Sequence, residues 1–262
     1  MGTHIGTLFD LSGCTALVTG GSRGLGLQVA EALGEAGARV VLTSRKAEDL
    51  AESVDHLGGR GIQAKWIAAD ASQPAEVARV CAEALSMLGS IDILVNNAGA
   101  SWGSPAEDHP LDAWDKVMNL NLRSAFLFSQ HVAKSSMIPR QNGRIIMMAS
   151  ICGLAGNGNG QETAAYNSSK GGLINLTRTL AAEWGKHGIR INAIAPGYFP
   201  SKLTSGLLKQ KGAETLSARS PLKRLGDESD LKGAALLFAS QAGKHITGQV
   251  LAVDGGVSAV LG

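Results

Sequence analysis

The chain has 262 residues, of which 44% are hydrophobic and 18% are charged, and its formal net charge is +2. This length allows one large domain or two small ones, and the near-neutral charge gives no reason to expect binding to nucleic acid or to an anionic membrane surface. No apolar run reaches the roughly 18–20 residues that a membrane-spanning helix needs.

The amino-terminal segment and the cysteines carry little functional signal. The first thirteen residues lack the basic start and the apolar core of a signal peptide, so we expect a loose arm. Cys14, Cys81 and Cys152 are odd in number and far apart, and they form no metal-ligand or redox spacing. The sequence therefore predicts no metal site, and free thiols suit a reducing cytoplasm.

The first strong pattern is a short apolar run at residues 14–19, followed at once by the glycine-rich residues 20–26 and an amphipathic helix that stops near Gly37. A strand, a glycine turn and a helix favour a nucleotide site, because small residues let the backbone approach a pyrophosphate and a helix start offers free N–H groups. A glycine turn without a ligand is the alternative. The predicted cofactor contacts in this turn are Gly20, Ser22, Arg23, Gly24, Leu25 and Gly26.

The end of the second predicted strand, residues 39–44, bears on the choice of cofactor. An acid here would bind the ribose hydroxyls of NAD, but the chain has Ser44, Arg45 and Lys46. The guanidinium groups of Arg45 and of Arg23 could hold a 2′-phosphate through paired hydrogen bonds. We therefore predict NADPH over NADH. A solvated helix start is the alternative, weakened because cations oppose the dipole at a helix N-terminus.

The third and fourth strands are predicted over residues 62–70 and 91–95. Asp70 stands at the carboxyl end of the third strand, where it either contacts a ligand or only starts the next turn and caps a helix. Asn96-Asn-Ala-Gly99 follows the fourth strand, in a composition typical of a turn.

The fifth predicted strand, residues 143–150, ends at Ser150, and Tyr166 and Lys170 follow within a helical pattern. Positions four apart on a helix share one face, so the phenol and the ammonium group are held side by side. A neighbouring cation lowers the pKa of a phenol from its ordinary value near ~10. The pair could thus exchange a proton with a carbonyl or an alcohol. An exposed Tyr and an unrelated Lys are the alternative reading of this common spacing.

Strands six and seven are predicted over residues 190–195 and 248–253, and the polar residues 201–221 between them are predicted to form a mobile lid. No repeat, low-complexity tract or linker interrupts the chain, so we expect one domain over residues 1–262. Strands alternate with helices, which indicates an α/β fold with a doubly wound parallel sheet. Ligands bind such sheets at the carboxyl ends of the strands. The predicted helices occupy residues 27–37, 46–57, 75–88, 111–139, 162–180 and 229–239.

These motifs together resemble the short-chain dehydrogenase/reductase family over about residues 12–256. The resemblance implies a single-domain Rossmann fold with seven parallel strands and helices on both faces. The spacing departs from the common pattern at one place: Ser150 and Tyr166 are sixteen residues apart, where most relatives have thirteen, and residues 156–160 hold the excess. The motifs that carry the resemblance are Thr19-Gly20-x-x-x-Gly24-x-Gly26, Asn96-Asn-Ala-Gly99, Asn121 in an N-L-x-x-x-F pattern, Ser150-Ile-Cys-Gly153, Tyr166-x-x-x-Lys170 and Pro196-Gly197.

The resemblance also implies roles for particular residues. Asn121, Ser150, Tyr166 and Lys170 are the implied catalytic residues, with Asn121 distorting its helix and holding a water linked to Lys170. Asp70 is the implied adenine contact. The further implied NADPH contacts are Asn97, Ala98 and Gly99 beside the cofactor, Tyr166 and Lys170 at the nicotinamide ribose, and Pro196, Gly197 and Thr204 at the nicotinamide amide.

The implied activity is reversible NADPH-dependent reduction of a ketone to a secondary alcohol. The pattern most resembles 3-oxoacyl-thioester reductases, in particular those of rhamnolipid pathways. A broad carbonyl or ketose (polyol) reductase, and a non-catalytic NADP-binding protein, are the alternatives. Relatives are commonly homotetramers, so we expect a homotetramer or a dimer, formed through helix surfaces around residues 111–128 and 172–182. A small carbonyl compound is the expected partner.

Overall fold

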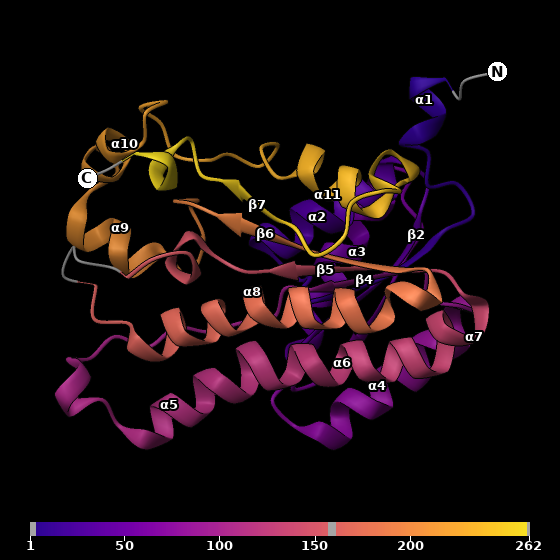
Figure 1. Ribbon diagram of the computed structural model, residues 1–262, viewed down its shortest axis with the longest axis horizontal. Coiled ribbons are helices and arrows are strands. Elements are labelled where there is room, and N and C mark those ends of the chain that lie inside the picture. Colours follow the sequence, from indigo (N-terminus) through magenta and orange to yellow (C-terminus); the bar gives the residue numbers. More distant parts are fainter. Residues whose placement is uncertain (1–3, 157–160, 261–262) are drawn as a thin grey trace.

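The computed structural model describes residues 4–156 and 161–260, which form a seven-stranded sheet in the order β3-β2-β1-β4-β5-β6-β7 (Figure 1). Every neighbouring pair is parallel. The order runs outward from β1 to β3 and then returns to β4, so the predicted doubly wound α/β sheet is confirmed. The strands are β1 Thr15–Thr19, β2 Arg39–Ser44, β3 Ala64–Ala68, β4 Ile93–Asn96, β5 Gly143–Met148, β6 Ile189–Pro196 and β7 Val250–Val253.

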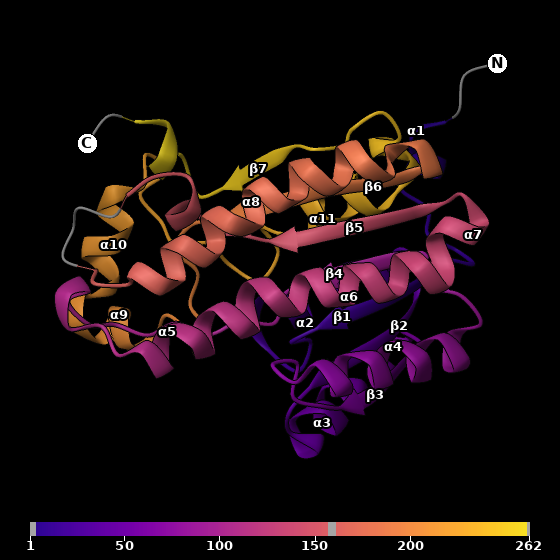
Figure 2. The same cartoon turned by 60° about the horizontal axis from the view of Figure 1, so that its bottom comes forward.

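Helices cover both faces of the sheet (Figures 1 and 2). On one side lie α2 (Gly24–Glu35), α3 (Ala47–Gly59) and α11 (Lys232–Ala239), and on the other lie α4 (Pro74–Leu88), α6 (Ser124–Val132) and α8 (Ala164–Trp184). Successive side chains of a strand point to opposite faces. Ala16 and Val18 therefore join one apolar core and Leu17 joins the other, which is why β1 reads as a continuous apolar run.

The predicted helix over residues 111–139 is broken twice by π-helical turns. It consists of α5 Leu111–Met118, the π turn η2 Asn119–Arg123, α6, the π turn η3 Ala133–Met137 and α7 Ile138–Arg140. The first π turn contains Asn121, so the helix distortion implied at this residue is present. Such single π turns are rare and are frequent at functional sites.

The segment predicted as a lid contains two helices that the sequence reading did not predict, α9 Ser205–Lys211 and α10 Ala213–Arg219. They meet at Gly212, whose φ of 80° lies in the left-handed region that glycine tolerates best. The described part of the arm contains a short helix, α1 Ile5–Leu8. Within residues 4–156 and 161–260, no helix combines the length and apolar character needed to cross a bilayer. Of the longer loop, residues 157–160 lie outside the described residues. Short 3-10 turns complete the described chain: η1 Ala106–Asp108, η4 Ile151–Gly153, η5 Gly185–His187, η6 Gln241–Gly243 and η7 Val257–Ala259.

Candidate active site

The predicted site residues gather at the carboxyl end of the parallel sheet, where α9 and α10 also lie (Figure 1). Gly20 follows β1, Ser44 ends β2, and Asn97 follows β4. Ser150 lies two residues beyond β5, and Pro196 ends β6. This edge is where open α/β sheets bind ligands, so the topology brings together residues that are far apart in the sequence.

The glycine turn after β1 is closed against the end of β4. Gly20 has a φ of 64°, and a Cβ there would come within 2.9 Å of the Ala98 Cα atom. A Cβ on Gly26 would collide with the Gly20 carbonyl group. The Asn97 side-chain amide donates to the Thr19 and Gly20 carbonyl oxygens at 3.0 and 2.9 Å. Glycine is thus required for close packing at both positions, and Asn97 fixes the turn.

The start of α2 is open to a ligand. Its N-cap residue, Arg23, has an extended backbone and no side-chain capping hydrogen bond. A Cβ on Gly24, whose φ is 54°, would meet no atom nearer than the Ser201 Cβ at 3.9 Å. Uncapped N–H groups at a helix start attract phosphate. This cradle therefore fits the predicted pyrophosphate, with buried Ser22 and half-buried Leu25 in the same turn.

The corner beyond β2 holds the cations that we predict to bind a 2′-phosphate. Arg45 is exposed, and in the described part of the chain its side chain makes no hydrogen bond or ion pair. Arg23 donates from Nη1 to the Asp49 carboxylate in the first turn of α3, at 3.1 Å. Nearby, the Asp70 Oδ1 atom accepts from the Ser72 backbone N–H at 2.9 Å. Asp70 therefore does shape the turn after β3, as the alternative reading held, and its role toward adenine stays a prediction.

Tyr166 and Lys170 lie on the same side of α8, as their spacing predicts. The Lys170 Nζ atom is 5.6 Å from the centroid of the phenol ring, and the Ser150 hydroxyl group lies near enough to the phenol to lower its pKa. Lys170 is 5% exposed, and its ammonium group donates to the Met148 carbonyl oxygen at 2.6 Å. Helix α8 can come this near because Gly153 has no side chain: a Cβ there would lie 2.6 Å from the Lys170 carbonyl carbon.

The protonation of this pair differs from the sequence-based expectation. Burial raises the pKa of Tyr166 to about 12, although the nearby Ser150 hydroxyl group acts in the opposite direction. Burial lowers the pKa of Lys170 to about 8. The expectation that the neighbouring cation would bring the phenol below its ordinary pKa is therefore wrong for the chain by itself, because desolvation is the largest influence on the phenol. At neutral pH the phenol keeps its proton, and Lys170 is largely charged.

Asn121 connects the π turn to the strand end and to α8. Its Oδ1 atom accepts from the Ala100 N–H at 2.8 Å, and its Nδ2 atom donates to the Ala100 carbonyl oxygen at 2.9 Å. The same Nδ2 atom donates to the Ser169 Oγ atom at 3.0 Å. Asn121 is 1% exposed. A Cβ on Gly99 would lie 3.3 Å from the Asn121 Oδ1 atom and 3.7 Å from the Lys170 Nζ atom, so these groups border one small space.

The segment after β6 is held by internal contacts. A Cβ on Gly197 would lie 2.7 Å from the Asp254 Cα atom, so glycine allows this loop to pack on the chain after β7. The Thr204 hydroxyl group donates to the Phe199 carbonyl oxygen at 2.6 Å and accepts from the Ser201 N–H at 2.9 Å. The Thr204 hydroxyl thus shapes the turn before α9, and its contact with a nicotinamide amide remains a prediction.

Cys152 is a site residue that the sequence reading missed, since it treated the residue only as a free thiol. Its N–H donates to the Ser150 Oγ atom at 3.2 Å, and the Ser150 hydroxyl group also acts on the pKa of its thiol. Burial raises the pKa of the thiol. Its place in Ser150-Ile-Cys-Gly153 was the available signal. In the described ranges, no group of three or more His, Cys, Asp or Glu side chains is placed to hold a metal ion.

Comparison with known proteins agrees with this arrangement. The profile of the family described as Enoyl-(Acyl carrier protein) reductase matches residues 20–258. The chain is 39% identical over 255 residues to gluconate 5-dehydrogenase of Gluconobacter oxydans, covering 97% of this chain and 98% of that protein. It is 40% identical over 253 residues to the rhamnolipids biosynthesis 3-oxoacyl-[acyl-carrier-protein] reductase of Pseudomonas aeruginosa, covering 95% and 97%. A crystal structure of a gluconate 5-dehydrogenase from Burkholderia cenocepacia, in complex with NADP and tartrate, superposes with a TM-score of 0.92 at 36% identity, covering 98% of this chain and 100% of that chain.

Proposed function

The chain belongs to the short-chain dehydrogenase/reductase family of oxidoreductases, and we propose that it reduces a ketone carbonyl to a secondary alcohol with NADPH. The observation that carries this proposal is the group formed by Ser150, Tyr166 and Lys170 at the carboxyl edge of the sheet. Its phenol lies close to the Ser150 hydroxyl group and stays protonated at neutral pH because burial raises its pKa to about 12. A protonated phenol is suited to giving a proton to a carbonyl oxygen.

In the proposed reaction, Tyr166 gives its phenolic proton to the ketone oxygen. Ser150, whose hydroxyl group lies close to that phenol, donates a hydrogen bond to the same oxygen and so stabilises the charge that develops there. When bound, NADPH supplies the hydride that reaches the carbonyl carbon. Lys170 holds the nicotinamide ribose with its buried ammonium group. Asn121 borders the space beside Lys170, and we assign it to the water path that returns a proton to Tyr166.

The chain's own residues fit NADPH along this edge. The open start of α2 would receive the pyrophosphate, Arg23 and Arg45 the 2′-phosphate, and Asp70 the adenine. Asn97, Ala98 and Gly99 would lie beside the cofactor, and Pro196, Gly197 and Thr204 would hold the nicotinamide amide. The crystal structure of the Burkholderia gluconate 5-dehydrogenase is that of a complex with NADP and tartrate. NADPH and NADH should be compared by kcat/KM; similar values for the two would contradict the assignment of Arg23 and Arg45.

We propose a 3-oxoacyl thioester as the substrate, following the sequence pattern and the Pseudomonas relative. A ketone derived from a sugar acid is the second candidate, because the gluconate 5-dehydrogenase of Gluconobacter is nearly as similar, at 39% identity against 40%. NADPH consumption should be measured with acetoacetyl-CoA, 5-keto-gluconate and a simple diketone. The highest kcat/KM is expected with acetoacetyl-CoA, and a higher value with 5-keto-gluconate would replace the first candidate by the second.

Tyr166→Phe tests the chemistry whichever ketone proves best. Removing the hydroxyl group should lower kcat by about 10³-fold, within the range for loss of a general acid, while the dissociation constant for NADPH stays within about twofold. The matched control is Tyr198→Phe, since Tyr198 is the chain's other tyrosine and is not assigned to the chemistry. Near-normal reduction by Tyr166→Phe, with NADPH still bound, would refute the mechanism.

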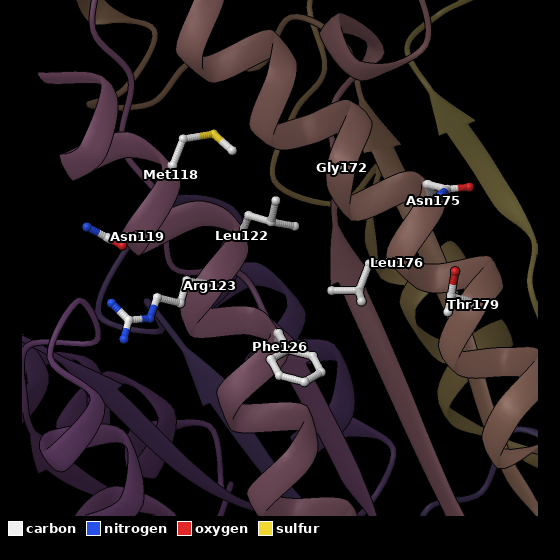
Figure 3. Close-up of a pocket in the computed structure, with 9 residues that line it drawn as sticks. All are labelled: Met118, Asn119, Leu122, Arg123, Phe126, Gly172, Asn175, Leu176 and Thr179. Atoms are coloured by element: carbon white, nitrogen blue, oxygen red, sulfur yellow. The ribbon is translucent and has the colours of Figure 1, made fainter. Parts of the chain in front are cut away.

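We propose that the chain self-associates through the outer groove between η2 and α8, which Figure 3 shows. Leu122 and Leu176 face each other across it, with Phe126 at one end. The groove has a volume of about 450 Å³, and nearby Leu111 is 80% exposed. A second copy is the proposed occupant, because the groove falls within both helix surfaces that the sequence predicts to pair.

The chain's free cysteines fit the cytoplasmic location that we also propose.

Phe126→Asp should shift the mass measured by light scattering towards the monomer, because a charge would be buried in the interface. Met87→Asp is the matched control, since Met87 and Phe126 are both 37% exposed and Met87 lies on α4, outside the groove. A monomeric parent chain, or an equal response of the two variants, would contradict this surface. A dimer or a tetramer would each support it.

A further inference from the structure

The corner beyond β2 contains a carboxylate as well as the cations expected to receive a 2′-phosphate. Asp49 accepts from the Arg23 guanidinium group at 3.1 Å, and the two side chains are 30% and 50% exposed. Arg45 and Lys46 are exposed beside them. A 2′-phosphate that uses Arg23 must therefore compete with a fixed negative charge for the same donors.

Asp49 is anchored independently of Arg23. The Ser53 hydroxyl group lies 2.7 Å from the Asp49 carbonyl oxygen and 2.7 Å from the Ser22 carbonyl oxygen, so it links the first turn of α3 to the glycine turn. Ser53 is 4% exposed. Because this contact holds the backbone at Asp49, the carboxylate stays beside the phosphate corner even when Arg23 turns towards a ligand.

We propose that Asp49 weakens and tunes the binding of the 2′-phosphate of NADP(H), by competing for Arg23 and by repelling the phosphate directly. This inference rests on the proposed assignment of Arg23 to that phosphate. Like charges at close range oppose binding, and the effect is reduced by solvent and salt at an exposed site. Asp49 thereby sets how strongly the chain prefers NADPH over NADH, which lacks the phosphate.

Asp49→Asn is the most informative change, because the amide oxygen can still accept from Arg23 while the charge is lost. Its dissociation constant for 2′,5′-ADP, measured by calorimetry, should fall about threefold to tenfold. The value for 5′-AMP should stay unchanged, because that ligand has no 2′-phosphate. The gain should shrink as salt is raised.

Glu48→Gln is the matched control. Glu48 lies in the same first turn of α3 and is exposed, and it has no hydrogen bond or ion pair among the described residues. Glu48→Gln removes the same charge from nearly the same place. An equal gain in affinity for 2′,5′-ADP in both variants would therefore mean a general charge effect and would overturn the specific role of Asp49. Weaker binding of 2′,5′-ADP by Asp49→Asn would overturn it too, by showing that Asp49 holds Arg23 ready for the phosphate. No change in binding would do the same, leaving only a favourable charge at the start of α3.

Arg23→Ala separates this inference from the assignment on which it rests. If Arg23→Ala leaves the affinity for 2′,5′-ADP unchanged, the assignment of Arg23 fails. If Arg23→Ala weakens binding but Asp49→Asn has no effect, only the inference about Asp49 fails. In the Arg23→Ala background, the gain from Asp49→Asn should be clearly smaller than in the parent, because the competition for Arg23 has been removed.

Discussion

The two ends of the sheet treat a buried charge in opposite ways. At the amino end, Asp92 is 5% exposed and forms an ion pair with Arg140, and it also accepts from the Thr15 N–H and hydroxyl groups at 2.9 and 3.0 Å. Burial alone would raise the pKa of Asp92, but these partners outweigh it and hold the pKa below its ordinary value. At the carboxyl end, buried Lys170 has only the Met148 carbonyl oxygen as its described hydrogen-bond acceptor, and its pKa falls to about 8.

The difference separates a charge that stabilises the fold from one that is kept ready for a ligand. A buried charge with well-placed partners is costly to disturb, whereas a buried charge without a counterion lowers stability and is retained where it serves a function. The amino-end cluster therefore joins β1, β4 and α7, and the carboxyl-end cluster belongs to the proposed active site. Changes at the two ends should move stability in opposite directions, and only those at the carboxyl end should lower activity.

The largest effect is expected from Lys170→Met, which replaces the ammonium group with an apolar side chain of similar length. We expect kcat/KM to fall by 10²-fold or more, on the order of the loss of an acid–base group. Because the charge no longer has to be buried, the free energy of unfolding at pH 7 should rise by about 1–3 kcal/mol.

Urea denaturation of Lys170→Met and the parent would give the change in stability, and NADPH consumption would give the activity. Arg178→Met, which removes a cation from the same helix at a position outside the proposed active site, is the control and should keep its activity. A variant of Lys170 that lost stability at pH 7 would show that the ammonium group stabilises the fold, and the contrast between the two ends would fail.

The next effect is expected from Asp92→Ala at the amino end. It leaves Arg140 without its partner and the Thr15 N–H and hydroxyl groups without their acceptor, so the free energy of unfolding should fall by about 2–4 kcal/mol. The Arg140 side chain is 37% exposed and can reach water, which keeps the loss moderate. Activity per folded molecule should be unchanged, because Asp92 lies at the other end of the sheet.

Asp55→Ala, at an exposed position on α3, is the control for Asp92→Ala and should leave the stability nearly unchanged. Because the native pKa of Asp92 is lowered, its stabilisation is present above the unfolded pKa near ~3.9 and is lost as the pH falls below that value. The difference between Asp92→Ala and the parent should therefore shrink below about pH 4. A difference that stays constant into acid would show that the charge of Asp92 contributes nothing.

The strands were predictable and the two helices of the segment at residues 201–221 were not, for a physical reason. Each strand end was predicted within two residues of its observed position, because buried parallel strands are continuous apolar runs bounded by turn residues. Helices α9 and α10 are short and polar, and their boundary is set by Gly212. No clear periodicity marks helices of this kind, so propensity and local contacts decide their structure.

The site was predictable in its membership and less so in its electrostatics. The spacing of Tyr166 and Lys170 predicts their shared face, but burial decides the direction of the phenol pKa, and burial depends on how η4 packs against α8. The contact between Arg23 and Asp49, 26 residues apart, depends on how Ser53 holds α3 against the glycine turn. Both depend on tertiary packing, which a local pattern does not contain.

The smallest effect is expected from a change of pH, and it measures the unpaired charge without any mutation. In the free chain Lys170 loses its charge as the pH rises through about 8, so kcat/KM for NADPH should fall about tenfold for each pH unit above that value.

The stability should respond in the opposite sense: between pH 8 and the unfolded pKa near ~10.4, the unfolded chain binds a proton that the native chain has released, which favours the native state. Because Cys81 and Cys152 have raised pKa values and oppose this rise, the useful quantity is the difference in stability between Lys170→Met and the parent. That difference should be largest below pH 8 and should disappear near pH 10; a difference independent of pH would mean that the cost at Lys170 comes from packing and not from its charge.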